Sequence, residues 1–348
     1  MRLQILGACL AVLLLTGCSG IAVVDYGVCS CPEENQPPAQ TPSGADSDSA
    51  SLKTGLAVIA GMSDSRNAEK VDYNVTVAAV AVDGGGIIRQ CILDGISAQV
   101  TVDGGGTITS DITAAVPTKN ELGEAYGMKA YGGATYEWDR QAAALADYAV
   151  GKTVQELQRS ALNAEGYAAA PELVTSATIK LDTLVQAVVQ AANSAQQRGM
   201  QAGDTLHLAV ISSLSGSTSA TADSSGIAQL DSDFAVVSRS GNTISSCYID
   251  SLQAKAAFDA AGTITSDIAA SIPTKNELGE AYGMKAFGGA TCEWDQQAES
   301  FSRFVTGKTL AEVAGLATPD GYAANADLAA SVTVRITGFQ ALIAKVFS

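Results

Sequence analysis

A long stretch of this chain occurs twice, and this duplication limits the fold more than any other feature. Residues 107–139 recur at residues 263–295, a shift of 156 positions, and five of the 33 aligned residues differ. The likeness continues to the Gly-Lys-Thr triplets at 151–153 and 307–309. Because each copy belongs to a segment long enough for its own core, the sequence predicts two tandem homologous domains.

The first residues have the pattern of an export signal. Arg2 precedes an apolar run from residue 3 to residue 15, which is too short to span a bilayer and matches the core of a signal peptide. The run ends in Leu-Thr-Gly-Cys at 15–18, which resembles the bacterial lipobox, in which the cysteine is acylated and the chain is cut before it. We expect a signal peptide over 1–17 and a lipidated Cys18. This would anchor the protein in the lipid bilayer on the extracytoplasmic face of a bacterial cell membrane.

Composition separates a tether from the folded part. Residues 18–52 are rich in Pro, Ser, Gly, Asp and Gln, a mixture that cannot bury enough apolar surface to order itself, so we expect a flexible linker. The remainder divides near 197–204, where no apolar period is found. The predicted repeat domains are therefore 53–197 and 204–348.

Charge and histidine content exclude several classes of function. The chain has 20 basic and 36 acidic side chains, a net charge of −16, which argues against a nucleic-acid partner. His207 is the only histidine. A histidine-based metal centre, or a Ser-His-Asp triad in both repeats, is therefore not expected.

Beyond Cys18, five cysteines lie in the predicted tether and domains, and one of them, Cys292, stands where the first repeat has Tyr136. Cys91 and Cys247 are 156 residues apart and so equivalent, and we expect both to be small buried hydrophobic residues. Cys29 and Cys31 lie close to the predicted anchor, where they could bind a soft metal, cycle between redox states or simply belong to the tether. The sequence favours the tether, because no further ligands lie nearby.

Each domain opens with the pattern of β-strands. Apolar residues alternate with polar or small ones, and glycine triplets at 84–86 and 104–106 mark turns in the first copy. The second copy repeats the order with weaker turn signals. We therefore predict an antiparallel meander in each domain, over 75–79, 87–92 and 100–102, and over 234–237, 243–249 and 254–258.

Helical signals follow the strands. Thr118 with Glu121, and Thr274 with Glu277, have capping-box spacing. Apolar residues then recur on one helical face from Trp138 to Ala149 and from Trp294 to Val305, Gly151 and Gly307 are placed to end these helices, and Thr153 and Thr309 to cap the next.

Each unit closes alike. We expect a short strand at 177–181 or 332–336, a cap at Asp182 or Thr337, and a final apolar helix. Together these elements predict an α+β fold made of two tandem homologous domains, each an antiparallel meander sheet packed with helices.

The closing segment carries a family resemblance. Residues 172–178 read Glu-Leu-Val-Thr-Ser-Ala-Thr, which resembles the Asp-x-x-Ser/Thr-Gly-Ala-Thr/Ser motif of FMN-binding domains in extracytoplasmic flavoproteins. In that family a transferase joins FMN to the last residue through a phosphoester. The resemblance implies covalent FMN at Thr178 and, in the second copy, at Thr333. The position of the motif glycine is occupied by Ser176 in the first copy and by Ser331 in the second. The second copy departs from the motif at three positions.

The repeated block is a second candidate site, because it changes least between the copies. Its aromatic, methionine and lysine side chains could stack a planar ring and neutralise a phosphate, or the aromatics could simply fill the core of a folded loop. The block also resembles that of uncharacterised exported repeat proteins of clostridial type. The candidate patch consists of Tyr126, Met128, Lys129 and Trp138 in the first copy and Tyr282, Met284, Lys285 and Trp294 in the second.

Two classes of function are left open. The FMN resemblance implies a membrane-anchored flavoprotein that transfers electrons outside the cell with a redox partner. The alternative is a non-catalytic lipoprotein that binds a small ligand or a cell-surface partner without flavin. A hydrolase is disfavoured, because the repeats share no histidine or nucleophile elbow, and Glu137 and Asp139 are two apart on a helix and point to different faces.

Overall fold

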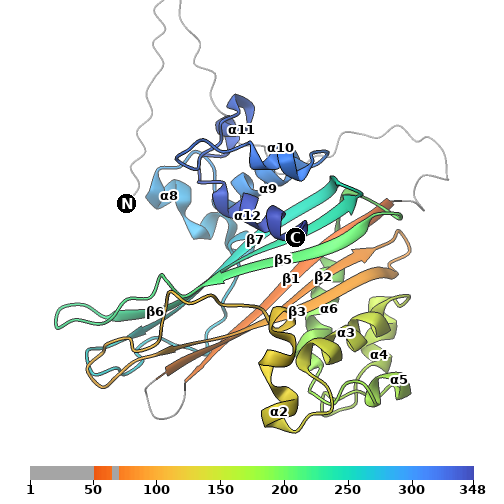
Figure 1. The fold of residues 1–348 in the computed structure, drawn as a ribbon, viewed down its shortest axis with the longest axis horizontal. Helices are drawn as coiled ribbons and strands as arrows, with labels where there is room; N and C mark the ends of the chain where they lie inside the picture. The colour runs from red at the N-terminus through yellow and green to blue at the C-terminus, as the bar shows by residue number, and fades with distance from the viewer. Residues whose placement is uncertain (1–50, 65–69) are drawn as a thin grey trace, which may run out of the picture.

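The computed structural model describes residues 51–64 and 70–348 and contains two antiparallel sheets within them (Figure 1). The predicted signal peptide, Cys18, Cys29, Cys31 and nearly all of the predicted linker lie outside the described residues. The first sheet has the order β3-β2-β1-β4 and the second the order β5-β6-β7. Their strands are β1 Ser51–Asp64, β2 Lys70–Val82, β3 Ile88–Thr101, β4 Gln196–Gln201, β5 Thr205–Ser213, β6 Gly226–Ser240 and β7 Thr243–Phe258.

The helices follow each sheet in the same order in both halves. The first half contains α1 Lys119–Leu122, the 3-10 helix η1 Gly123–Tyr126, α2 Met128–Gly132, α3 Trp138–Ala149, α4 Val154–Ser160, α5 Pro171–Val174 and α6 Asp182–Asn193. The second half contains α7 Lys275–Leu278, η2 Gly279–Tyr282, α8 Met284–Gly288, α9 Trp294–Val305, α10 Leu310–Ala314, α11 Ala326–Ser331 and α12 Thr337–Val346. The α+β fold expected from the sequence is confirmed.

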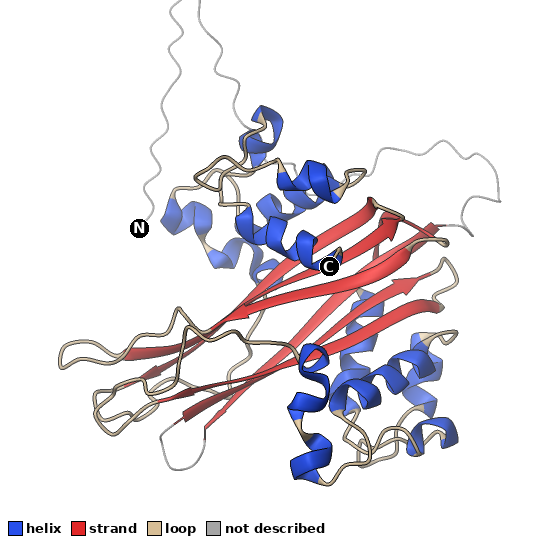
Figure 2. Ribbon diagram, viewed as in Figure 1, coloured by secondary structure: helices blue, strands red, loops and turns tan. Residues whose placement is uncertain are grey.

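The two sheets pack face to face, with helices on the outer sides. One core cluster unites inward side chains of both sheets, including Tyr73 and Val77 of β2 and Leu230 and Phe234 of β6. Two further clusters join the outer face of each sheet to the helices of the same half. Figure 2 shows the helices in two groups on opposite sides of the strands. The molecule therefore has four layers, helix, sheet, sheet and helix.

This layering explains why parts of the strands are apolar without a break. Residues 77–82 of β2 are all buried, with Val77 and Ala79 in the core between the sheets and Ala78 and Val80 in the core beneath the helices. A strand covered on both faces needs no polar side. Because each half covers the inner face of the other, neither sheet is independent of its partner.

Several local predictions are confirmed. Thr118, Thr274, Thr153 and Thr309 each form a capping box with the glutamate three residues later. The apolar faces of α3 and α9 are buried, and Gly151 and Gly307 adopt left-handed backbone conformations with φ of 84° and 85°.

Other local predictions are wrong. The strands expected at 177–181 and 332–336 do not form. The first amide of each segment donates to a carbonyl of the preceding helix, and the next two amides donate to a glutamine side chain and not to a neighbouring strand. Asp182 and Thr337 are the first residues of α6 and α12, and Leu181 and Ile336 hold the cap positions. The meander pieces merge into strands of 13 to 16 residues.

The segment at 197–204 is more ordered than its composition indicates. It forms most of β4, which pairs with β1, and Met200 is fully buried between the sheets. The predicted linker 18–52 also overlaps the start of β1 at Ser51. None of the helices in the described ranges is long and apolar enough to cross a bilayer.

Candidate functional site

The candidate site is a pocket between the two repeats. Its volume is about 490 Å³, and its walls come from β1, β4 and the end of α6 on one side and from β7 and α7 on the other. It is lined by Gly55, Leu56, Ala57, Val58, Gln190, Asn193, Ser194, Gln196, Arg198, Tyr248, Asp250, Thr274, Asn276 and Glu277.

The second pocket is smaller, about 280 Å³, and lies between β3 and α1 of the first repeat and β5 and α12 of the second. It is lined by Ile92, Asp94, Thr118, Asn120, Glu121, Leu208, Val210 and Lys345. The four polar residues of the first repeat, Asp94, Thr118, Asn120 and Glu121, are 156 positions before Asp250, Thr274, Asn276 and Glu277. We refer to each set as the polar quartet of its repeat.

Strand register shows that the two pockets are equivalent. Val77 pairs with both Val58 and Asp94, and Phe234 pairs with both Val210 and Asp250. Val58 therefore corresponds to Val210. Each pocket combines the quartet of one repeat with the first strand and last helix of the other.

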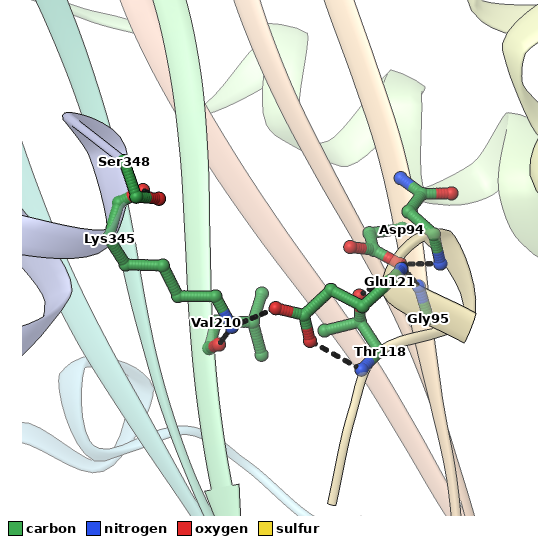
Figure 3. A network of polar contacts seen from close by, with 8 residues as sticks. Asp94, Gly95, Thr118, Glu121, Val210, Lys345 and Ser348 are labelled. Carbon is green, nitrogen blue, oxygen red and sulfur yellow. Dashed lines mark hydrogen bonds and ion pairs between the residues drawn. The ribbon is translucent and has the colours of Figure 1, made fainter. Parts of the chain in front are cut away.

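The quartet residues are held in place by the start of a short helix. In the first repeat, Oδ1 of Asp94 accepts hydrogen bonds from the amides of Gly95, at 2.7 Å, and Asn120, at 3.1 Å (Figure 3). The Asn120 side chain donates to the Leu93 carbonyl at 2.8 Å. Glu121 accepts from the Thr118 amide at 2.8 Å. These bonds fix α1 on β3 and point one oxygen of Glu121 across the pocket.

The second quartet has the same geometry around a more deeply buried carboxyl. Asp250 accepts from the amides of Ser251, at 2.7 Å, and Asn276, at 3.1 Å, and Glu277 accepts from the Thr274 amide at 2.8 Å. Burial disfavours the charged form and raises the pKa of Asp250 to about 7, against the opposing effect of these hydrogen bonds. The pKa of Asp94 is also raised by burial.

The pockets differ in what faces the quartet. In the smaller pocket Lys345 Nζ lies 2.5 Å from Glu121 Oε1 and donates to the Val210 carbonyl (Figure 3). The buried residues 184, 187, 188 and 191 of α6 match the buried residues 339, 342, 343 and 346 of α12 at a shift of 155. Gln190 of α6 therefore corresponds to Lys345 of α12. The larger pocket therefore lacks this internal ion pair among its described lining residues.

A further wall of the larger pocket comes from β4. The Arg198 guanidinium lies 4.1 Å from the centre of the Tyr248 ring and donates to the Thr54 carbonyl at 3.2 Å. Burial lowers the pKa of Arg198 and raises that of Tyr248 to about 12. Within the described residues, the buried Nε of Arg198 and Oδ1 of Asn276 have no hydrogen-bond partner. These two atoms are unmet polar groups beneath the surface of the pocket wall.

Sequence reasoning found only part of this site. The capping boxes identified Thr118, Glu121, Thr274 and Glu277 as local structure, not as pocket residues. Asp94 and Asp250 left one signal in the sequence, a repeated acid inside an otherwise buried strand. Nothing local predicts Val58 or Arg198, because the packing of the two halves brings them to the quartet.

The residues predicted to attach FMN lie elsewhere. The Thr178 amide and hydroxyl bond to Oε1 of Gln141, at 2.7 and 3.3 Å, and Thr333 bonds in the same way to Gln297. Both threonines are exposed, and neither lines one of the two pockets. The hydroxyls of Ser176 and Ser331 donate to carbonyls of the preceding helical turns.

The structure brings together some members of the predicted aromatic patch. Trp138 is buried, Tyr126 and Met128 pack against the same core, and the ammonium of Lys119 lies 5.2 and 4.9 Å from the Tyr126 and Trp138 ring centres. Lys129 is exposed. The second copy repeats this cluster with Tyr282, Met284 and Trp294 around Lys275, and Lys285 is again exposed.

Two buried polar side chains hold the repeated block together. Glu137 accepts from the amides of Met128, at 2.7 Å, and Lys129, at 3.1 Å, and so caps α2. Gln141 donates to the Tyr136 carbonyl at 2.8 Å while accepting from Thr178. The block thus ties α2, α3 and the closing segment of the repeat together.

The equivalent cysteines lie beneath the helices. Cys247 is buried as predicted, whereas Cys91 packs against the corresponding core but keeps some exposure. Both are free thiols, and burial raises the pKa of each to about 12. Neither is activated as a thiolate nucleophile at neutral pH.

No cluster of histidine, cysteine, aspartate or glutamate side chains in the described ranges is placed to hold a metal ion. A comparison with protein-family models, with curated proteins and with solved structures found no match to this chain. The resemblance to FMN-binding domains remains a hypothesis from the motif residues.

Proposed function

We propose that this chain is an exported, lipid-anchored binding protein that holds a small molecule in the larger pocket between its repeats. The observation that carries the proposal is the pocket itself. Its volume of about 490 Å³ falls within the roughly 300–1,000 Å³ of small-molecule sites. Strand β1 contributes small and aliphatic residues to its lining, and the other repeat contributes a few polar groups.

The polar groups favour recognition over catalysis. Asp250 already accepts two backbone hydrogen bonds, and Glu277 caps α7, so both carboxyls are fixed by the fold. The described lining residues include no cysteine nucleophile, no histidine to serve as its base and no cluster of metal ligands. A fixed carboxylate, an amide and a guanidinium suit the orientation of a polar ligand.

Electron transfer through FMN is supported less well by the geometry. Thr178 and Thr333 are exposed and lie outside both pockets, so a flavin attached there would not have these cavities as its binding site. The binding proposal instead uses surface from both repeats and accounts for their close packing. The lipid anchor at Cys18 remains part of the proposal, and Cys18→Ser should release the protein from the membrane fraction.

The test is stabilisation by ligands of the mature chain. A panel of small polar metabolites is screened by thermal unfolding, since a ligand at 100 times its Kd stabilises a protein by about 2.7 kcal/mol. Asn193 is exposed at the pocket edge, and Asn193→Trp should block the site and remove the stabilisation.

The matched control is Ser348→Trp. Ser348 lies two residues after the end of α12, corresponds to Asn193 at the shift of 155, and lines neither pocket. It should leave the stabilisation unchanged. Ligand effects that survive Asn193→Trp, or the absence of any stabilising compound, would contradict the proposal.

A further inference from the structure

Lys345 places an ammonium against the polar quartet of the first repeat. In the smaller pocket its ammonium is held by the Glu121 carboxylate, at 2.5 Å, and by the Val210 carbonyl (Figure 3). Glu121 is oriented by its bond to the Thr118 amide. An ion pair combined with a carbonyl acceptor is a recognition pattern for a primary ammonium, which has three N–H donors and no acceptor.

The larger pocket contains the same acceptors without the lysine. Glu277 is held by the Thr274 amide at 2.8 Å, as Glu121 is by Thr118, and Val58 corresponds to Val210. None of the ion pairs formed among the described residues involves Glu277. Gln190, which replaces Lys345, supplies no positive charge.

The Val58 carbonyl is directed toward this pocket edge. On β1 the Thr54 carbonyl accepts from Arg198 and the Leu56 carbonyl accepts from Ser194, both on the side away from β2. Carbonyl directions in a strand repeat every second residue, so the carbonyl of Val58 faces the same side. The paired residues of β4 extend along β1 only as far as Thr54.

From this equivalence we infer that the larger pocket binds a small molecule through a primary ammonium, placed between the Glu277 carboxylate and the Val58 carbonyl. The inference rests on the proposed binding function and specifies its ligand class. The greater volume, about 490 against 280 Å³, gives room for an amine with a larger body than a lysine side chain. Above its pKa of about 7, Asp250 adds a second carboxylate to that of Glu277, against the guanidinium of Arg198, which also favours a cation.

The probe is n-butylammonium, which reproduces the lysine side chain, and its neutral counterpart is n-butanol. Titration of the mature protein by calorimetry or NMR should detect one equivalent of bound n-butylammonium and no bound n-butanol. Glu277→Gln keeps an oxygen to accept from the Thr274 amide but removes the charge, and should weaken binding at least tenfold.

An exchange of residues between the two pockets gives a sharper test. Gln190→Lys should supply an internal ammonium and abolish binding, whereas Gln155→Lys, on the exposed face of α4, adds the same charge elsewhere and should not. Lys345→Gln should open the smaller pocket and raise the stoichiometry to two. Binding of n-butylammonium that Gln190→Lys leaves intact would overturn the inference.

The outcomes distinguish a failure of the ammonium inference from a failure of the proposed binding function. If only neutral or anionic compounds bind, and Asn193→Trp removes their binding, the pocket is a ligand site and the ammonium assignment is wrong. If no compound of any charge binds, both proposals fall. Tighter binding of Nα-acetyl-lysine amide, which keeps its side-chain ammonium, than of n-butylammonium would support the ammonium site and identify a peptide lysine as the source of the group.

Discussion

The repeated block offers a quantitative test of why it is nearly the same in both copies. Glu137 is 5% exposed, and its two carboxylate oxygens accept from the amides of Met128 and Lys129, the first two of α2. Helix amides at this end have no partner within the helix. We predict that Glu137→Gln destabilises the protein, because the amide side chain has only one acceptor oxygen.

The size of the effect follows from these contacts. A hydrogen bond to a charged group contributes about 1.5–3 kcal/mol, and a buried donor without a partner costs about 1–3 kcal/mol. Replacing one acceptor oxygen by NH₂ removes one such bond, so we expect a loss of about 2 kcal/mol. In the second copy Glu293 accepts from Met284 and Lys285 at 2.8 and 3.1 Å and also from the Gln296 amide in the capping box of α9, so Glu293→Gln should cost at least as much.

Urea unfolding of the mature protein measures these losses. Glu124→Gln is the control, because Glu124 is exposed in the same block and its side chain makes none of the contacts described for Glu137. Hydrogen exchange at the Met128 and Lys129 amides should accelerate in Glu137→Gln. If both buried substitutions change stability by no more than Glu124→Gln, local folding does not explain the block, and a binding role for Tyr126 and its neighbours regains support.

Three further predictions test the packing, the buried acid and the flavin hypothesis. A Cβ at Gly55 would lie 1.9 Å from the Ala191 carbonyl oxygen, so Gly55→Ala should lower the free energy of unfolding in urea by about 3 kcal/mol. Gly61 is on the same strand with nothing within 4 Å of its Cβ position, so Gly61→Ala should change this free energy by less than about 0.5 kcal/mol. Equal effects would contradict the contact between β1 and α6. Because burial raises the pKa of Asp250 to about 7, the folded state keeps a proton that the unfolded chain releases near pH 4, and this group's contribution to stability falls as pH rises from about 4 to 7; Asp250→Asn should remove that fall, and parallel stability profiles for the two proteins would refute it. Co-expression with a flavin transferase should add no mass and no visible absorbance, and an added mass abolished by Thr178→Ala would replace the binding proposal with a flavoprotein.

Elements specified by neighbouring residues could be predicted from the sequence. The capping box of Thr118 and Glu121 and the apolar face of α3 depend on contacts within one or two turns, which spacing reveals. The strand at 177–181 could not be judged in this way, because the side chain of Gln141 bonds to its amides from 37 residues away. Strand β1 is not among the strands predicted from the sequence, since Gly55, Ala57 and Gly61 have weak strand propensity.

The candidate site depends on packing that no single repeat encodes. The unbroken apolar run of β2 indicates cover on both faces, but not that the second repeat provides it. Asp250 and Val58 are far apart in the sequence and meet only because the sheets face each other. The difference between Gln190 and Lys345 gains meaning only after the two pockets are superposed through their strand register.

A crystal structure of the mature protein soaked with n-butylammonium is the decisive measurement for an ammonium site between the repeats. We expect electron density for the amine in the larger pocket, with its nitrogen within hydrogen-bond distance of the Glu277 carboxylate and the Val58 carbonyl. Density for the amine only at exposed carboxylates elsewhere, with none in this pocket at saturating concentration, would contradict it.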